Sequence, residues 1–116
     1  MATDIRVKRV YEPPAPDDGC RVLIDRLWPR GLTKEKAHLD LWLKDVAPSA
    51  ELRTWFGHKP ERWLEFRRRY KAELDGSTAF AELRGMSRKL RLTLLYAARD
   101  EEHNDAVVLA DLLGRS

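Results

Sequence analysis

The 116-residue sequence is poor in cysteine, with one residue, Cys20. A single thiol excludes an internal disulfide and a zinc centre built on a cysteine cluster. Cys20 follows the turn signature Asp17-Asp18-Gly19, immediately before a predicted strand, and no neighbour that would activate it as a nucleophile is evident. We interpret Cys20 as structural or incidental, and we expect neither a cofactor nor a metal ion.

Long apolar runs are also missing. No stretch approaches the roughly 20 residues that a membrane-spanning helix needs, and residues 1–12 lack the apolar region of a secretory signal. Hydrophobic residues make up 43% of the chain and charged residues 35%. This composition is typical of a soluble globule and not of a disordered chain. The sequence predicts a cytoplasmic protein without a membrane partner.

Neither sign of charge is in strong excess. The 22 lysines and arginines nearly balance the 19 aspartates and glutamates, so the formal net charge is +3. Only local clustering of basic residues can therefore create a strong positive field. The length predicts one domain, residues 1–116, with a sizeable buried core.

Apolar patterning predicts strands that alternate with helices. Three strands are expected, over residues 5–11, 21–27 and 92–97. Helices are expected over residues 47–57, 60–76, 80–90 and 105–113, with Gly85 as an interruption and a helical turn capped by Thr33 over 31–37. Residues 39–46 fit either a helix or a strand. The pattern predicts an α/β domain with a mainly parallel sheet of about four strands, covered by helices on both faces.

Two polar segments follow predicted strands. They are DRLWPRG, residues 25–31, and ARDEEHN, residues 98–104. If the strands are parallel neighbours, their carboxyl ends face one crevice. Guanidinium groups and the amides at a helix start suit phosphate or carboxylate, so we hypothesise a small anionic ligand there. The alternative is that Asp25 and an arginine form a structural ion pair while Trp28 covers the edge of the core.

Under the anion hypothesis each candidate has a role. The candidate ligand-binding residues are Arg26, Trp28, Arg30, Lys34, Trp42, Tyr96 and Arg99. The candidate catalytic residues are Asp25, His58 and Asp100, which can orient guanidiniums or transfer protons. His58 is a candidate general base because imidazole side chains suit that role near neutral pH, and packing of this turn histidine on Trp55 is the alternative interpretation. His103 lies among acids, where we favour a helix start over a metal site.

The chain resembles a known family over nearly its whole length. The motifs DRLWPRG, residues 25–31, and LLYAARD, residues 94–100, are similar to those of the YeaO-like bacterial proteins, a short branch of domain-of-unknown-function family 488. Longer relatives in that family place a strand where residues 39–46 fall, so the resemblance favours a strand there. It implies no particular activity.

The longer relatives also carry a C-A-E…C-H-R pattern after the last strand. Here Tyr96 stands at its first cysteine and Ala98 at its glutamate, and residues 104–106, Asn-Asp-Ala, replace C-H-R. Thiol, metal or redox chemistry through those groups is therefore not implied for this chain. The part of the resemblance that remains is the corner formed by Asp25 and Arg26, followed by Pro29.

Three functions remain open from the sequence. The first is a binder of a small anion, or a hydrolase or transferase acting on one. The second is a nucleic-acid-binding or regulatory module that uses basic residues of the first strand and of the helix over 60–76, namely Arg6, Lys8, Arg9 and Arg67. The third is an interaction domain without chemistry. The sequence does not indicate an oligomeric state.

Overall fold

The core of the fold is a four-stranded parallel sheet. The computed structural model describes residues 4–114. Its strands are β1 (Asp4–Arg9), β2 (Cys20–Leu23), β3 (Leu41–Trp42) and β4 (Arg91–Tyr96), in the order β1-β4-β2-β3. All three strand pairs are parallel, which confirms the predicted sheet. β4 lies between β1 and β2, and its residues from Leu92 to Tyr96 are buried.

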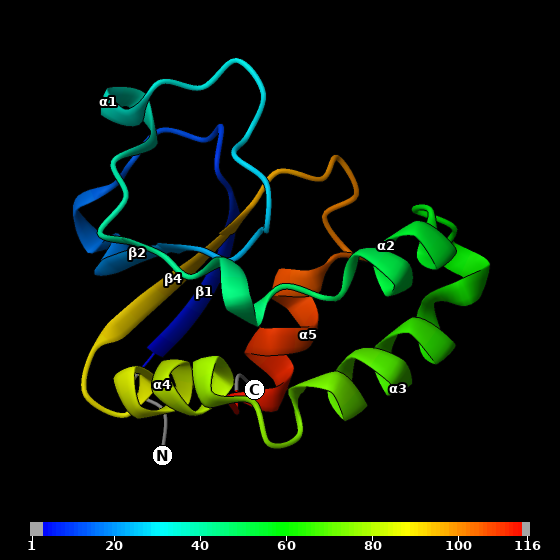
Figure 1. Ribbon diagram of the computed structural model, residues 1–116. Coiled ribbons are helices and arrows are strands. Elements are labelled where there is room, and N and C mark those ends of the chain that lie inside the picture. The colour runs from blue at the N-terminus through cyan, green and yellow to red at the C-terminus, as the bar shows by residue number, and fades with distance from the viewer. Residues whose placement is uncertain (1–3, 115–116) are drawn as a thin grey trace.

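Within residues 4–114, five α-helices connect and cover the strands. They are α1 (Lys34–Ala37), α2 (Ala50–Phe56), α3 (Trp63–Leu74), α4 (Thr78–Ser87) and α5 (Asp105–Leu112). Four of them begin where a short polar side chain accepts a backbone N–H, which is the usual N-cap arrangement. These caps are Thr33, Ser49, Ser77 and Asn104. Figure 1 shows α2 to α5 gathered at the lower and right-hand side of the molecule, with α1 alone at the upper left.

The main core lies between the sheet and helices α2 to α5. Side chains alternate along a strand, so Leu92, Leu94 and Tyr96 of β4 all face the same way. They pack in one cluster with side chains such as Phe66 of α3 and Leu109 of α5. Helices α2 to α5 therefore cover this face of the sheet.

The opposite face has a thinner cover. Leu23 and Leu95 pack there against Trp28 and against residues just before and after α1, and Ala37 of α1 is buried. Arg21 is also buried on this side, where it donates to the Ala37 carbonyl at 2.9 Å and to the Asp18 carboxylate at 2.5 Å. Helical cover on both faces is confirmed, with one short helix on this side.

Several predicted boundaries differ from the structure. β2 ends at Leu23 and not at residue 27, because the side chain of Asp25 already bonds to the neighbouring strand end. Residues 39–46 form the two-residue strand β3 and then the 3-10 turn Lys44–Val46. Gly85 lies inside α4 without interrupting it, and α4 starts early because Ser77 caps it. Within residues 4–114 no helix is long and apolar enough to cross a membrane.

Candidate functional site

The exits of β2 and β4 lie on the same rim of the sheet. The two strands are parallel neighbours, with Leu23 opposite Leu95. The Ile24 amide donates to the Leu95 carbonyl at 3.1 Å, and the Ala97 amide then donates to Oδ2 of Asp25 at 2.9 Å. The two polar segments that follow these strands therefore meet at one edge, as the sequence predicts.

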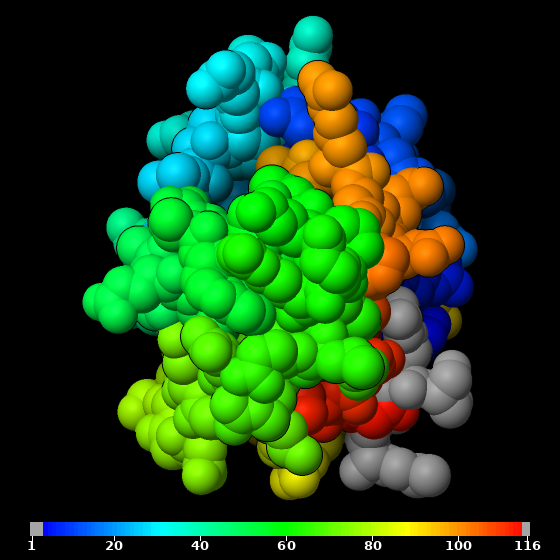
Figure 2. Space-filling view, turned by 90° about the vertical axis from the view of Figure 1, so that its right-hand side faces the viewer, coloured from blue at the N-terminus to red at the C-terminus, as the bar shows by residue number. Residues whose placement is uncertain are grey.

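A cleft of about 490 Å³ opens at this edge. Its walls come from the loop after β2, the segment 47–58 that contains α2, the helix α3, and the loop between β4 and α5. Figure 2 shows the cyan, green and orange parts of these walls meeting on one face of the molecule. The polar residues that line the cleft are Asp25, Arg26, Arg30, Arg53, His58, His103, Asn104 and Asp105.

Two carboxyl groups, those of Asp25 and Asp105, interact within the cleft. Burial raises the pKa of Asp105 well above its ordinary value, and the charge of Asp25 and the hydrogen bond between the two carboxyls raise it further. Burial also raises the pKa of Asp25, although hydrogen bonds from Asp105 and Ala97 and the positive charge of Arg53 oppose the rise. The pair therefore keeps one shared proton to a higher pH than an isolated aspartate would.

Three arginines line the same cleft as this acid pair. Arg26 donates from Nη2 to the Ala47 carbonyl over a long 3.4 Å. Its Nε is buried and has no hydrogen-bond partner within residues 4–114. A buried donor without an acceptor is rare in native proteins, because it loses its bonds to water and gains none in return. Arg53 of α2 and Arg30 of the β2 loop are exposed residues that also line the cleft.

A family model described as the inactive DUF488-N3 subclade matches residues 4–116. The chain belongs to this DUF488 subclade. It is 50% identical over 111 residues to the uncharacterized protein Rv3073c of Mycobacterium tuberculosis, an alignment that covers 96% of this chain and 94% of the relative. It is 44% identical over 111 residues to the uncharacterized protein YeaO of Escherichia coli, covering 95% and 96%. The predicted family is thus confirmed. No solved structure matches the chain.

Five of the residues predicted for the DUF488 site line the cleft. They are Asp25, Arg26, Trp28, Arg30 and His58. Trp28 also donates from its indole to the Leu32 carbonyl at 2.7 Å and packs with Leu23 and Leu95, so it covers the core edge as well. The ion pair between Asp25 and an arginine, the alternative interpretation, is not formed among residues 4–114.

The other predicted residues lie outside the lining of the cleft. Tyr96 is buried in the main core, Lys34 and Arg99 are exposed, and Trp42 donates to the Asp25 carbonyl at 2.7 Å while its ring packs against Trp28 at 5.4 Å. Their roles in ligand binding stay predictions. The inward position of Tyr96 follows from strand alternation, because it has the same parity as Leu92 and Leu94.

Asp100 organises the loop between β4 and α5. Its Oδ1 accepts the amides of Glu102 at 2.9 Å and His103 at 3.0 Å, and its Oδ2 contacts Nδ1 of His103 at 2.9 Å. The bond from the Glu102 amide, with those from His103, lowers the pKa of Asp100 although burial opposes the fall. Asp100 is not among the residues that line the cleft, whereas His103 is, with its ring edge-on to Trp63 at 5.2 Å.

Sequence reasoning missed four polar residues of the cleft, one of which, His103, it assigned to a helix start. Arg53 is an exposed helix residue whose pattern is that of a solvated face, and only the packing of α2 beside the strand ends brings it there. Asn104 and Asp105 begin α5, where both residue types are typical of a helix start. The sequence feature that could have placed them in the cleft is the position of α5 directly after the loop that follows β4. Residues 4–114 contain no group of three or more histidine, cysteine or acidic side chains that could hold a metal ion.

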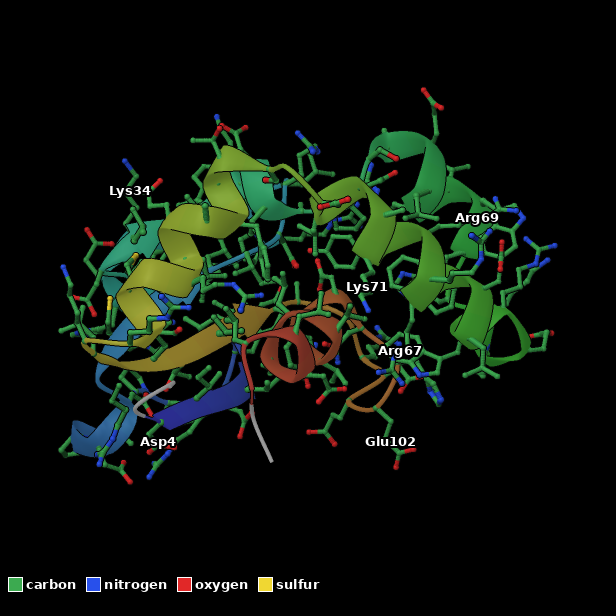
Figure 3. All side chains as sticks on the ribbon, turned by 90° about the horizontal axis from the view of Figure 1, so that it is seen from below. Asp4, Lys34, Arg67, Arg69, Lys71 and Glu102 are labelled. Atoms are coloured by element: carbon green, nitrogen blue, oxygen red, sulfur yellow. The ribbon has the colours of Figure 1, made fainter. Side chains whose placement is uncertain are left out.

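The basic residues proposed for nucleic-acid binding are largely engaged in intramolecular contacts. Arg6 pairs with Asp17 at 2.6 Å, Lys8 with Asp18 at 3.1 Å, and Arg9 donates to the carbonyls of Ala97 and Ala98. On α3, Figure 3 shows Arg67 and Lys71 on the side toward α5 and Arg69 on another side. Nucleic-acid binding stays a prediction.

Proposed function

We propose that this DUF488 chain binds a small ligand bearing a phosphate or carboxylate group in the cleft at the carboxyl ends of β2 and β4. The observation that carries the proposal is the unpartnered, buried Nε of Arg26 on a wall that two further arginines share. An anionic oxygen would satisfy this donor, and arginine binds phosphate and carboxylate with two parallel hydrogen bonds.

The charge balance of the cleft supports an anion. Arg26, Arg30 and Arg53 bring three positive charges, and the acids among the lining residues are Asp25 and Asp105. Even with both carboxyls ionised, these acids bring two negative charges against the three positive ones. The local sum of charge is therefore positive.

We propose that the protein binds this ligand without converting it. Hydrolase or transferase activity is the alternative. The description of the subclade as inactive favours the absence of turnover. So does the position of the replaced residues: Ala98, Asn104 and Asp105, which stand where longer relatives carry other groups, all line this cleft. Asp25 and His58 remain the groups that turnover would require as acid and base.

The test is a titration of the protein with inorganic phosphate and, separately, with acetate, at constant ionic strength, followed by NMR of the backbone amides. Saturable shifts are expected for amides at the cleft, such as those of Ala97 and Ala98. Arg53→Gln should weaken phosphate binding about tenfold, since a charge-assisted bond is lost from an exposed position that folding does not require.

The matched control is Arg91→Gln. Arg91 is an exposed arginine at the other end of β4, where it pairs with Asp4 at 3.1 Å, so this variant should bind like the wild type. The absence of saturable shifts with both anions, in folded protein, would refute the proposal. Phosphate release from phenyl phosphate, seen by phosphorus NMR and lost in Asp25→Asn, would establish turnover instead.

A further inference from the structure

The cleft combines its cationic side with an apolar side. Phe56 and Phe66, stacked at 4.4 Å between ring centroids, belong to its lining, as do Pro29, Pro48 and Ala47. A volume of about 490 Å³ lies within the range of sites for whole small molecules and far exceeds a single phosphate or carboxylate group. The anionic group therefore leaves room for a larger body beside it.

Two large apolar side chains of the lining are exposed. Leu27 is 61% exposed and Tyr11 is 40% exposed, and both belong to the residues that line the cleft. Solvent-facing apolar groups in a concave site are a common mark of ligand contact, since the ligand removes them from water.

Tyr11 is held in place beside a cationic lining residue. Its hydroxyl donates to the Arg30 carbonyl at 2.8 Å, and the guanidinium of Arg9 lies 5.0 Å from its ring centroid. Arg30 itself lines the cleft. Tyr11 is thus anchored to the backbone of Arg30, and both residues line the cleft.

We infer that the ligand is an aromatic anion, an aryl phosphate or an aromatic carboxylate, whose ring contacts Leu27 and Tyr11 while its charged group meets the arginines. This inference rests on the proposed function. A planar ring suits the cleft better than a flexible chain because Tyr11, Trp28 and Phe56 offer aromatic surface and the guanidiniums can stack on a π-face.

The test compares methyl phosphate, cyclohexyl phosphate and phenyl phosphate, which carry the same charged group on different bodies. Phenyl phosphate should bind about tenfold more tightly than methyl phosphate, and several-fold more tightly than cyclohexyl phosphate. Leu27→Ala should remove much of the advantage of phenyl phosphate over methyl phosphate. Leu27 is exposed, so this variant is expected to fold normally.

The matched control is Leu64→Ala, which truncates a leucine that is 78% exposed on α3 and outside the lining of the cleft. It should bind all three phosphates like the wild type. Equal affinity for the three phosphates would overturn the inference and leave anion binding intact. Equal affinity for cyclohexyl and phenyl phosphate alone would overturn the aromatic class. Binding of none of them would overturn the proposed function and this inference together.

Discussion

The amide of Ala97 donates a hydrogen bond of 2.9 Å to Oδ2 of Asp25, so a side chain joins the end of β4 to the segment that leaves β2. The regular ladder between the two strands has ended by this point, because β2 stops at Leu23. The same carboxyl group interacts with Asp105 at the start of α5. Asp25 thus holds the ends of the two strands together and also belongs to the acid pair of the cleft.

The shared proton should make stability depend on pH through Asp105. Its pKa is higher in the folded than in the unfolded protein, so its contribution to stability is full below the unfolded value, about 3.9, and is lost as the pH rises through the folded value. Asp105→Asn resembles the neutral form. The free energy of unfolding of the wild type, minus that of this variant, should therefore fall with rising pH in urea denaturation series above about pH 4.

Asp17→Asn provides a control of opposite sign. The hydrogen bond and charge of Arg6 lower the pKa of Asp17, so its contribution is present above the unfolded pKa and is lost as the pH falls. The free energy of unfolding of the wild type, minus that of Asp17→Asn, should therefore rise with pH. A difference for Asp105→Asn that stays constant from pH 4 to pH 9 would show that the two carboxyls do not share a proton.

The sequence predicts the parallel sheet and one edge of the cleft because those features depend on local patterns. The apolar run before Asp25 and the run before Ala97 are visible as strands, and parallel pairing places their ends together. The pairing of Asp25 with Asp105 is not visible, since it joins residues 80 positions apart and Asp105 alone looks like an ordinary helix-start acid. Arg53 reaches the cleft only through tertiary packing.

Breaking the buried ion pair on the thinly covered face should destabilise the fold. Arg21 and Asp18 are 4% and 2% exposed, and their atoms are 2.5 Å apart. Although burial opposes it, bonds from the Ala15 amide, Lys8 and Arg21 lower the pKa of Asp18. In Arg21→Met, Lys8 is the cation that still pairs with this carboxylate. The free energy of unfolding, measured by urea denaturation, should fall by about 3 kcal/mol.

Arg91→Gln is the matched variant for an exposed pair. It removes the 3.1 Å contact between Arg91 and Asp4, whose side chains are 45% and 38% exposed, respectively. The free energy of unfolding should fall by less than about 1 kcal/mol. A loss for Arg21→Met as small as that for Arg91→Gln would mean that the Asp18 carboxylate is solvated in the native protein.

Gly19 should tolerate no side chain, whereas Gly31 should tolerate one at moderate cost. Both have positive φ, 67° and 74°. A Cβ at Gly19 would lie 2.5 Å from the Arg91 carbonyl oxygen, but a Cβ at Gly31 would meet nothing within 4 Å. Gly31→Ala should cost about 1–2 kcal/mol from backbone strain alone, and Gly19→Ala about 3 kcal/mol or more. Equal thermal shifts for the two variants would contradict this steric explanation.

We expect the Asp100 carboxylate to hold the loop between β4 and α5, which is a structural role and differs from the proton transfer considered for it in the sequence analysis. Asp100→Ala removes the acceptor of the Glu102 and His103 amides, so hydrogen exchange at these two amides should accelerate about tenfold or more. Asp100→Asn retains an acceptor oxygen and should preserve most of the protection. If exchange at both amides is unchanged in Asp100→Ala, the loop is held by other contacts, such as the bond from Asn104 to the Asp100 carbonyl at 3.0 Å, and the positioning role of the carboxylate is wrong.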